Sequence, residues 1–415
     1  MAPVAAGCPV AADLELLDPG FLSDPFPLMS AWREKTPVFY VPEVNLHFVT
    51  RYEDVEAIFL DRDTFGAANA SSPVWPLAPA VGALLAEKVP RKPTLNNADP
   101  PRHGPMRTAV LKALTPRRIA AMEPVLREVA GRLIDELAAK PVTDLVADLA
   151  FPFPGYAGFS LLGFPEHDWD LLKQWCRKRV QITYGRLSDE EQMDVAQNVV
   201  AFWEYCDAHV GLREREPADD FTSDLLAYAS EHPDLVNRLD VVTIVYSIAL
   251  AGHDTTTCAF TSGLRYLLAE RAQWEAIVAD RSLAVNAVEE MLRFDPPILG
   301  HRRVVLRDTE VAGVPLPEGA HLFLCFASAH RDPQQFPEPD RFDIRRTEAR
   351  SNLSFGKGVH FCIGAPLARL EMKIAVELLA ERVPELRLVR DQDYEITPNI
   401  VFRSMKQLLA ETGAR

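Results

Sequence analysis

The sequence predicts a mainly α-helical protein with a minor β region. Between about residues 102 and 300, apolar side chains recur at spacings of three and four, most clearly over 122–138, 168–180 and 190–210. That spacing is typical of amphipathic helices. Residues 303–326 instead alternate apolar with polar side chains around several turn residues, which predicts short strands. A long helix is expected after residue 364, followed by a short strand-like tail.

The first hundred residues predict a mixed arrangement. We expect a helix over 25–35, short strands over 38–41 and 46–50, and a helix over 52–61. Residues 66–101 are rich in Pro, Ala, Asn and Ser, and we expect an irregular loop there that acts as a substrate lid, because long irregular segments of compact proteins usually bind ligands. Residues 1–20 are expected to be loosely ordered, and residues 1–415 to form a single domain.

Composition excludes several classes of protein. With 44 basic and 59 acidic residues the net charge is -15, which argues against nucleic acid as a partner. The N-terminal sequence lacks the pattern of a signal peptide, and the apolar run over 241–252 is about half of a membrane span. We therefore expect a cytoplasmic protein with no membrane contact. We also expect a monomer. The six cysteines show no CxxC spacing, so they are expected to be reduced.

A glycine-rich loop with the sequence FGKGVHFCIG spans residues 355–364 and brings Cys362 to the start of an apolar helical segment. A helix N-terminus favours negative charge and therefore a thiolate. Gly356 and Gly364 allow the backbone to approach a flat partner closely, and Phe355 supplies an apolar wall. The loop lacks the glycine spacing of a dinucleotide fingerprint, and His360 with Cys362 has no second pair of zinc ligands. A haem with an axial thiolate is the obvious candidate.

The pattern FGxGxHxCxG resembles the haem-binding signature of the cytochrome P450 family of haem-thiolate monooxygenases. The resemblance runs from about residue 20 to 410 and implies the single-domain P450 fold, an α-rich part plus a small β-rich part. It also implies haem b (iron protoporphyrin IX) as cofactor, with Cys362 as the metal ligand and with Phe355, Gly356, His360 and Gly364 in the loop that binds it.

A second motif, AGHDTTT, lies in the middle of a helix of roughly 30 residues that the spacing predicts over 238–271. Gly252 and the threonine run after it disfavour a helix interior. An acid next to an alcohol, as in Asp254 and Thr255, can pass protons to a buried site. The string resembles the family's A/G-G-x-D/E-T motif, which implies that Asp254 and Thr255 supply protons on the oxygen-binding side and that Ala251 and Gly252 line the oxygen pocket.

Further positions follow from the same resemblance. Glu290 and Arg293 share a helix face, and the family's ExxR plus arginine triad maps onto Glu290, Arg293 and Arg341 as a structural network. The haem propionates need cations or hydrogen-bond donors. The resemblance implies that four residues provide them: His103, Arg107, Arg302 and His360.

The resemblance also implies a substrate pocket and redox partners. The expected lining is mostly apolar: Val74, Trp75, Leu77, Ile182, Tyr184, Leu250, Ile298, Leu299, Val401 and Phe402. It suits a small or medium hydrophobic substrate, aromatic ones included, that dioxygen converts by hydroxylation or oxidative dealkylation. Only 53 residues follow Cys362, so we expect electrons from a separate ferredoxin and ferredoxin reductase. The ferredoxin is expected to dock on four basic residues: Lys112, Lys357, Arg369 and Lys373.

Two alternatives remain open at the level of sequence. One is a peroxygenase driven by hydrogen peroxide, which would not need the acid and alcohol pair at Asp254 and Thr255. The other is a haem-based sensor or carrier without turnover, which would need neither a proton relay nor a substrate lid.

Overall fold

The computed structural model describes residues 3–5, 7–90 and 92–414, and these separate into two compact units. Unit 1 consists of the described residues within Met1–Ala70, Arg127–Pro152 and Thr255–Arg415. Unit 2 consists of those within Ser71–Leu126 and Phe153–Asp254. The prediction of a mainly helical fold with small sheets is confirmed, and all the sheets lie in unit 1.

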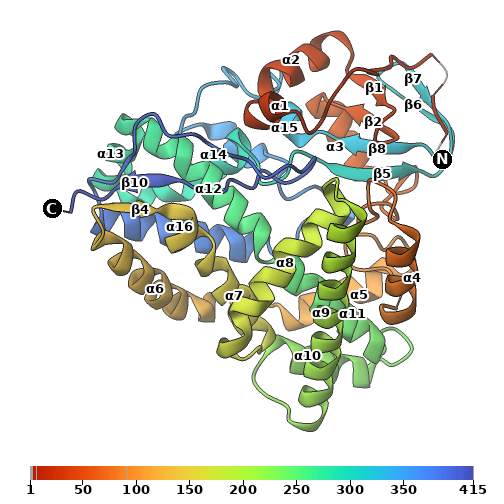
Figure 1. The fold of residues 1–415 in the computed structure, drawn as a ribbon, viewed down its shortest axis with the longest axis horizontal. Helices are drawn as coiled ribbons and strands as arrows, with labels where there is room; N and C mark the ends of the chain where they lie inside the picture. Colours follow the sequence, from red (N-terminus) through yellow and green to blue (C-terminus); the bar gives the residue numbers. More distant parts are fainter. Residues whose placement is uncertain (1–2, 6, 91, 415) are drawn as a thin grey trace. The chain divides into compact units, whose positions relative to one another are not determined.

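The largest sheet of unit 1 has five strands in the order β1-β2-β8-β5-β3. Its strands are β1 (Val38–Val41), β2 (Leu46–Val49), β3 (Phe65–Gly66), β5 (His301–Val305) and β8 (His321–Leu324). The neighbours are antiparallel except β2 and β8, which run parallel with Val49 opposite Leu324. Strands from the two ends of the chain therefore form one sheet (Figure 1).

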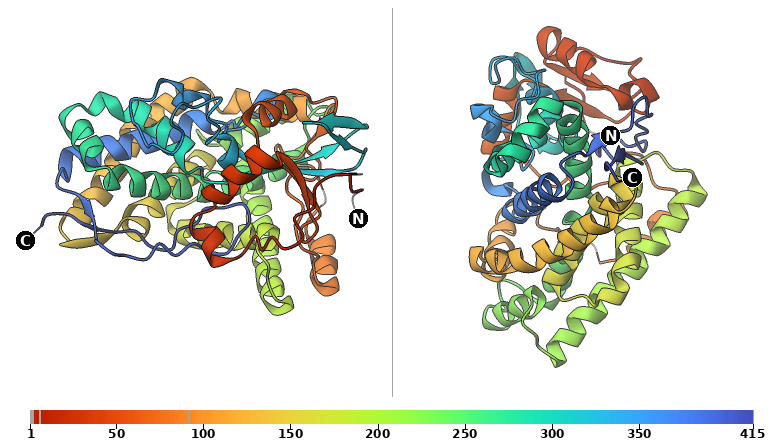
Figure 2. Two further views of the ribbon diagram at one scale, coloured as in Figure 1. Left: turned by 90° about the horizontal axis from the view of Figure 1, so that it is seen from above. Right: turned by 90° about the vertical axis from the view of Figure 1, so that its left-hand side faces the viewer.

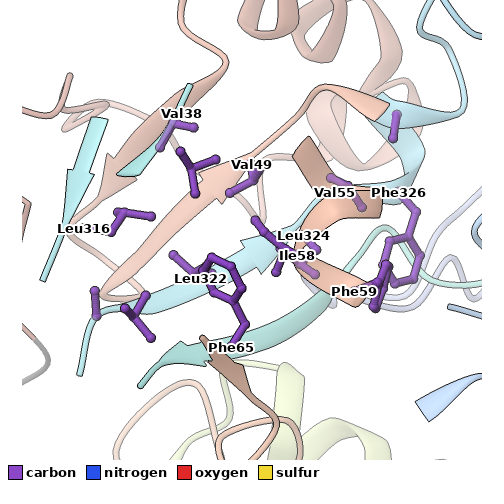
Figure 3. Close-up of a cluster of buried hydrophobic side chains, with 14 of the residues drawn as sticks. Val38, Val49, Val55, Ile58, Phe59, Phe65, Leu316, Leu322, Leu324 and Phe326 are labelled. Carbon is purple, nitrogen blue, oxygen red and sulfur yellow. The ribbon is translucent and has the colours of Figure 1, made fainter. Parts of the chain in front are cut away.

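Apolar side chains of this sheet pack against the short helices that flank it (Figure 3). Val49, Leu322 and Leu324 from the strands contact Ile58 and Phe326 from the helices, and all five are almost fully buried. The helices of this cluster are α3 (Tyr52–Leu60) and α15 (Phe326–Ala329). Helix α2 (Phe26–Lys35), which follows the short helix α1 (Pro19–Ser23), packs through Trp32 against Phe39 and Phe48 of the sheet. Burying this surface is the main stabilising contribution in this part of unit 1.

The rest of unit 1 is mostly helical. Its helices are α6 (Pro116–Ala138) from Arg127 onward, α12 (Asp254–Ala269) from Thr255 onward, α13 (Arg271–Ala279), α14 (Ala284–Phe294) and α16 (Ala365–Arg382). One small sheet has the order β4-β10-β9, with strands β4 (Val142–Asp144), β9 (Arg387–Leu388) and β10 (Leu409–Glu411). The other is the hairpin of β6 (Thr309–Val311) and β7 (Val314–Leu316). Short helical turns cover Val146–Ala150, Arg281–Leu283, Thr347–Ser351 and Gly358–His360.

All the regular secondary structure in the described residues of unit 2 is helical. It contains α4 (Pro79–Lys88), α5 (His103–Ala113), the start of α6, α7 (Pro152–Leu162) from Phe153, a turn over Glu166–Asp168, α8 (Trp169–Tyr184), α9 (Asp189–Arg215), α10 (Phe221–Glu231) and α11 (Arg238–Ala251). Capping boxes begin α9 at Ser188 and α11 at Asn237, each with an acidic residue three positions later. Helices α8 and α9 lie side by side (Figures 1 and 2).

Three sequence expectations differ from the structure. The lid at 66–101 is not wholly irregular, because residues 79–88 form α4, which packs against α9. The N-terminal stretch is not loose in its described part, because the Ala5 amide donates to His47 Nε2 at 3.1 Å and Val10 bridges to Tyr40. The helix expected over 238–271 is divided into α11 and α12.

Candidate active site

The cysteine loop lies in unit 1 and presents Cys362 immediately before α16. All six cysteines are in the described part of the chain, and Cys362 is the exposed one. Its amide donates to the Phe355 carbonyl at 2.8 Å, and α16 begins three residues later with Gly364 at the N-cap. Pro366 fits the first turn because its missing N–H would have no partner within the helix. The sulfur is therefore accessible where the helix end favours negative charge.

Backbone geometry explains the glycines at the start of this loop. Gly356 and Gly358 have φ angles of +66° and +69°, which side chains disfavour. A Cβ on Gly358 would also lie 2.5 Å from the carbonyl oxygen of Phe59. Glycine is required at Gly358 for both reasons, and the loop can therefore pack tightly against α3.

Burial makes the other thiols poor nucleophiles and poor metal ligands. It raises the pKa of Cys8, Cys176 and Cys206, and it raises the pKa of Cys325 to about 12. Within the described residues no group of three or more His, Cys, Asp or Glu is placed to bind a metal ion. Cys362 is consequently the best thiolate ligand that the described chain offers.

An ion pair from α14 supports the aromatic wall of the loop. The Arg369 guanidinium lies 4.4 Å from the centre of the Phe355 ring. Its Nε and Nη2 donate to the two carboxylate oxygens of Glu289 at 2.7 and 3.1 Å, and Asn352 Nδ2 donates to the same carboxylate at 3.1 Å. Sequence reasoning missed Glu289, although it directly precedes the ExxR glutamate. The pair connects α14, α16 and the residues before the cysteine loop.

The ExxR pair is observed, and both of its side chains are fully buried. Arg293 Nε and Nη2 donate to Glu290 at 2.7 and 2.8 Å, and Arg293 Nη1 donates to the carbonyls of His330 and Pro339. Glu290 also accepts the backbone N–H of Asp343 at 2.9 Å. The pair therefore anchors the segment that leads to the cysteine loop.

The third member of the triad was assigned wrongly to Arg341. The Arg341 side chain is 62% exposed and contacts Glu338 and Asp343 at the surface. Arg346 takes the expected place, because the chain turns after Phe342 and directs the Arg346 Nε to Glu290 at 3.3 Å. Its other nitrogens donate to three backbone carbonyls: Pro337, Glu338 and Arg341.

The proposed proton-relay residues lie at a break between helices. Helix α11 ends at Ala251, Gly252 and His253 lie outside any helix, and Asp254 begins α12. The break falls where glycine and the threonine run lower helix propensity. His253 is almost fully buried, and its Nδ1 lies 3.3 Å from a carboxylate oxygen of Asp254. Sequence reasoning gave His253 no role.

Cationic side chains gather around β5 in unit 1. His301 is partly buried in the structure, and desolvation together with the charges of Arg303, Arg302 and His360 lowers the pKa of His301 to about 3. Arg302 is itself buried and donates to the Ala70 carbonyl at 3.1 Å. In unit 2, His103 and Arg107 lie one turn apart on α5, and burial and the Arg107 charge lower the pKa of His103. A concentration of positive charge of this kind suits anionic groups such as propionates.

The predicted pocket residues are brought together in two sets, one in each unit. In unit 1, Leu299 donates to the Val401 carbonyl at 2.7 Å and Ile298 bridges to Phe402. In unit 2, the Val74 amide donates to the Thr183 carbonyl at 2.9 Å, which ties the lid to the end of α8, where Ile182 and Tyr184 lie. Leu77 packs with Ile182 in the cluster of α4 and α9. Leu250 lies in the last turn of α11.

The predicted basic docking patch is largely neutralised. Lys357 pairs with Glu56, Arg369 with Glu289, and Lys373 with Glu377. Of the four residues, Lys112 lies in unit 2, in the last turn of α5. The expectation of a basic patch is therefore wrong for the three residues of unit 1, because each faces a carboxylate. Glu377 lies four residues after Lys373 on α16, whereas the fold brings Glu56 and Glu289 from distant segments. Among the described helices, none is long and apolar enough to cross a bilayer.

The fold is mainly helical with small sheets, and its glycine-rich loop presents an accessible thiol before a long helix. This combination is typical of haem-thiolate proteins. The family model for cytochrome P450 matches residues 156–384. Cytochrome P450 monooxygenase PikC of Streptomyces venezuelae is 31% identical over 96% of this chain and 94% of its own. Vitamin D(3) 25-hydroxylase of Pseudonocardia autotrophica is 32% identical over 97% of both chains.

Solved structures agree with the sequence relatives. Cytochrome P450 CREJ in complex with (4-ethylphenyl) dihydrogen phosphate has a TM-score of 0.91 at 34% identity, covering 94% of this chain and 98% of its own. An intact type IV self-sufficient cytochrome P450 monooxygenase has a TM-score of 0.94 at 34% identity, covering 100% of this chain and 55% of its own. The chain belongs to the cytochrome P450 family. It is a haem-dependent cytochrome P450 monooxygenase of the kind found in bacteria.

Proposed function

We propose that this monooxygenase inserts one atom of dioxygen into a small or medium hydrophobic substrate, aromatic ones included, by hydroxylation or oxidative dealkylation. The observation that carries the proposal is the accessible thiol of Cys362 before α16, beside a loop without side chains at Gly356 and Gly358. The apolar character of both pocket sets favours hydrophobic substrates. Relatives named as hydroxylases or epoxidases support the reaction type, and the aryl phosphate bound by CREJ supports a substrate with an aromatic ring.

The residues fit a haem, and we propose specific roles for them. Cys362 is the axial ligand, Phe355, Gly356 and Gly364 shape the loop, and four residues hold the propionates: His103, Arg107, Arg302 and His360. The cationic surroundings of His301 support the two donors in unit 1. When bound, the haem iron supplies the redox chemistry that activates dioxygen. We propose further that the two units together form the single haem domain predicted over 1–415.

Asp254 and Thr255 are proposed to move protons. The Asp254 carboxyl is buried and lies next to the buried His253 ring, so a proton can pass between the two side chains before it reaches the Thr255 hydroxyl. Ala251 and Gly252 leave the helix break without bulky side chains, which is why we place the oxygen pocket there. Replacing Asp254 by Asn should lower product formed per electron consumed and increase hydrogen peroxide release.

Replacement of Cys362 by Ser tests the axial ligand. The variant should lose the thiolate-type absorption of the ferrous carbon monoxide complex, while Cys8→Ser, a matched change at a buried thiol, should keep it. A Cys362→Ser protein with an unchanged spectrum would show that another residue holds the iron. Circular dichroism of both variants separates a lost ligand from a lost fold.

Electrons are proposed to come from a separate ferredoxin and ferredoxin reductase. Product formation should require such a redox pair and dioxygen. Product with hydrogen peroxide alone would instead support the peroxygenase alternative, and the absence of product with every donor would support a sensor or carrier. Because Lys357, Arg369 and Lys373 are already paired with carboxylates, we expect a weak dependence of the electron-transfer rate on salt. A monomeric state and a cytoplasmic location stay predictions.

A further inference from the structure

Three hydrogen-bond donors in unit 2 face too few acceptors. The Tyr246 side chain is 6% exposed, and its hydroxyl has no hydrogen-bond acceptor. The indole N–H of Trp75, in the lid, is also buried without a partner. The Arg179 guanidinium, on α8, donates to the Thr183 hydroxyl and forms no ion pair with any described carboxylate. Buried donors are normally satisfied, so such a set requires an explanation.

Tyr246 and Arg179 meet where α8 packs against α11. Cys176 Sγ contacts the Ala249 carbonyl at 3.4 Å, which aligns the two helices one turn away from Tyr246. Burial raises the pKa of Tyr246, and the charge of Arg179 and a hydrogen bond from its guanidinium lower it in part. The guanidinium therefore lies beside the phenol. Arginine can only donate, so it cannot accept the hydroxyl proton of Tyr246.

The lid reaches the same helix. The Val74 amide donates to the carbonyl of Thr183, the residue whose hydroxyl accepts from Arg179. Trp75 follows directly in the chain, so its indole belongs to the segment held at this end of α8. The neighbouring cation on α8 behaves differently, because Lys178 pairs with Asp194 at 2.8 Å. Of these two neighbouring cations on α8, Arg179 is therefore the one without a carboxylate partner among the described residues.

We propose that Arg179, Tyr246 and Trp75 form a subsite that binds an oxyanion, a carboxylate or a phosphate, on an otherwise hydrophobic substrate. Arginine binds both groups through paired hydrogen bonds, and the phenol and indole supply neutral donors that an oxyanion can satisfy. This inference rests on the proposed monooxygenase function and narrows its substrate class to amphipathic acids. The apolar residues Val74 and Ile182, next to the donors, would contact the hydrophobic body.

Three aryl probes test the subsite: 4-propylbenzoate, its neutral isostere 4-propylbenzamide, and 4-propylphenyl phosphate. Binding to the haem-loaded protein is measured by the spin-state shift and, independently, by calorimetry. Hydrogen bonds to a charged group predict that the benzoate binds on the order of tenfold or more tightly than the benzamide. Tighter binding of the phosphate than of the benzoate would assign the site to phosphate esters, and the reverse would assign it to carboxylic acids.

Variants locate the effect. Arg179→Gln should reduce the ratio of benzoate to benzamide affinity to about one, and Tyr246→Phe should reduce it in part without removing the ring packed on Phe202 and Trp203. Lys178→Gln is the matched control and should leave the ratio unchanged. The proposal is overturned if the native protein shows no preference or binds none of the probes, or if Lys178→Gln acts like Arg179→Gln.

The ferrous carbon monoxide spectrum keeps this test separate from the proposed function. An anion preference measured by calorimetry in a protein without the thiolate-type spectrum would retain the oxyanion subsite and reject the haem-thiolate assignment. A thiolate-type spectrum without any anion preference would retain the haem-thiolate assignment and reject the oxyanion subsite.

Discussion

Replacing Arg346 by Ala should destabilise the protein far more than replacing Arg341 by Ala. Arg346 is buried, and its guanidinium bonds Glu290 and three backbone carbonyls. Removing it leaves those carbonyls unsatisfied and deprives a fully buried carboxylate of one of its two arginines. Breaking a buried pair costs about 3–5 kcal/mol. Because Arg293 still compensates Glu290, we expect a loss of about 3 kcal/mol, at the lower end of that range.

The measurement is urea unfolding of the haem-loaded protein, followed by far-UV circular dichroism and haem absorbance. With a slope of about 3 kcal/mol per M, a loss of about 3 kcal/mol lowers the midpoint by about 1 M. Arg341→Ala removes only exposed ion pairs and should cost less than about 1 kcal/mol. An Arg341→Ala protein at least as unstable as Arg346→Ala would refute the assignment of Arg346 to the network.

Three further expectations concern pH, the lid and the cysteine loop. Burial lowers the pKa of His330 to about 3 in the folded protein, against about 6.5 when unfolded. Unfolding then takes up a proton, so stability should fall as pH drops below 6.5, by about 1.4 kcal/mol per pH unit. Urea titrations at pH 7 and 5 should show a smaller difference for His330→Gln, and an equal difference would contradict this reasoning. Val74→Pro removes the amide that donates to Thr183, so stopped-flow spin-shift kinetics should show faster ligand association; an unchanged rate would mean that this contact does not limit access. Glu289→Gln weakens the support of Arg369, and the thiolate-type carbon monoxide spectrum should decay faster with time, whereas an equal decay rate would count against this support.

Local motifs were predictable from sequence to the extent that neighbouring residues determine them. The start of α16 after Cys362 follows from glycine, proline and helical spacing within a few positions. The strands at 38–41 and 46–49 follow from β-branched and aromatic residues between turns. In these cases the residues that form the element and the residues that begin or end it are close together in the sequence.

Long-range partners were not predictable in the same way. Arg341 and Arg346 lie within one short segment of the sequence. The turn between them decides which guanidinium reaches the Glu290 carboxylate. Similarly, the residues next to Lys357 in the sequence do not indicate its partner, but the fold brings its ammonium group to the Glu56 carboxylate on α3. Such pairings depend on how distant segments return to each other, which a single sequence does not encode at any fixed spacing.

The two consecutive carboxylates of α14 have separate structural roles. Successive residues of a helix point about 100° apart, so Glu289 and Glu290 cannot serve the same partner. Glu290 faces Arg293 and Arg346 and holds the segment that enters the cysteine loop, while Glu289 faces Arg369 and holds the helix that leaves it. One rigid helix thereby fixes both ends of the loop between Asn352 and Arg369. The position of Cys362 should therefore depend on both carboxylates together, so the effects of Glu289→Gln and Arg346→Ala on the carbon monoxide spectrum should not be additive.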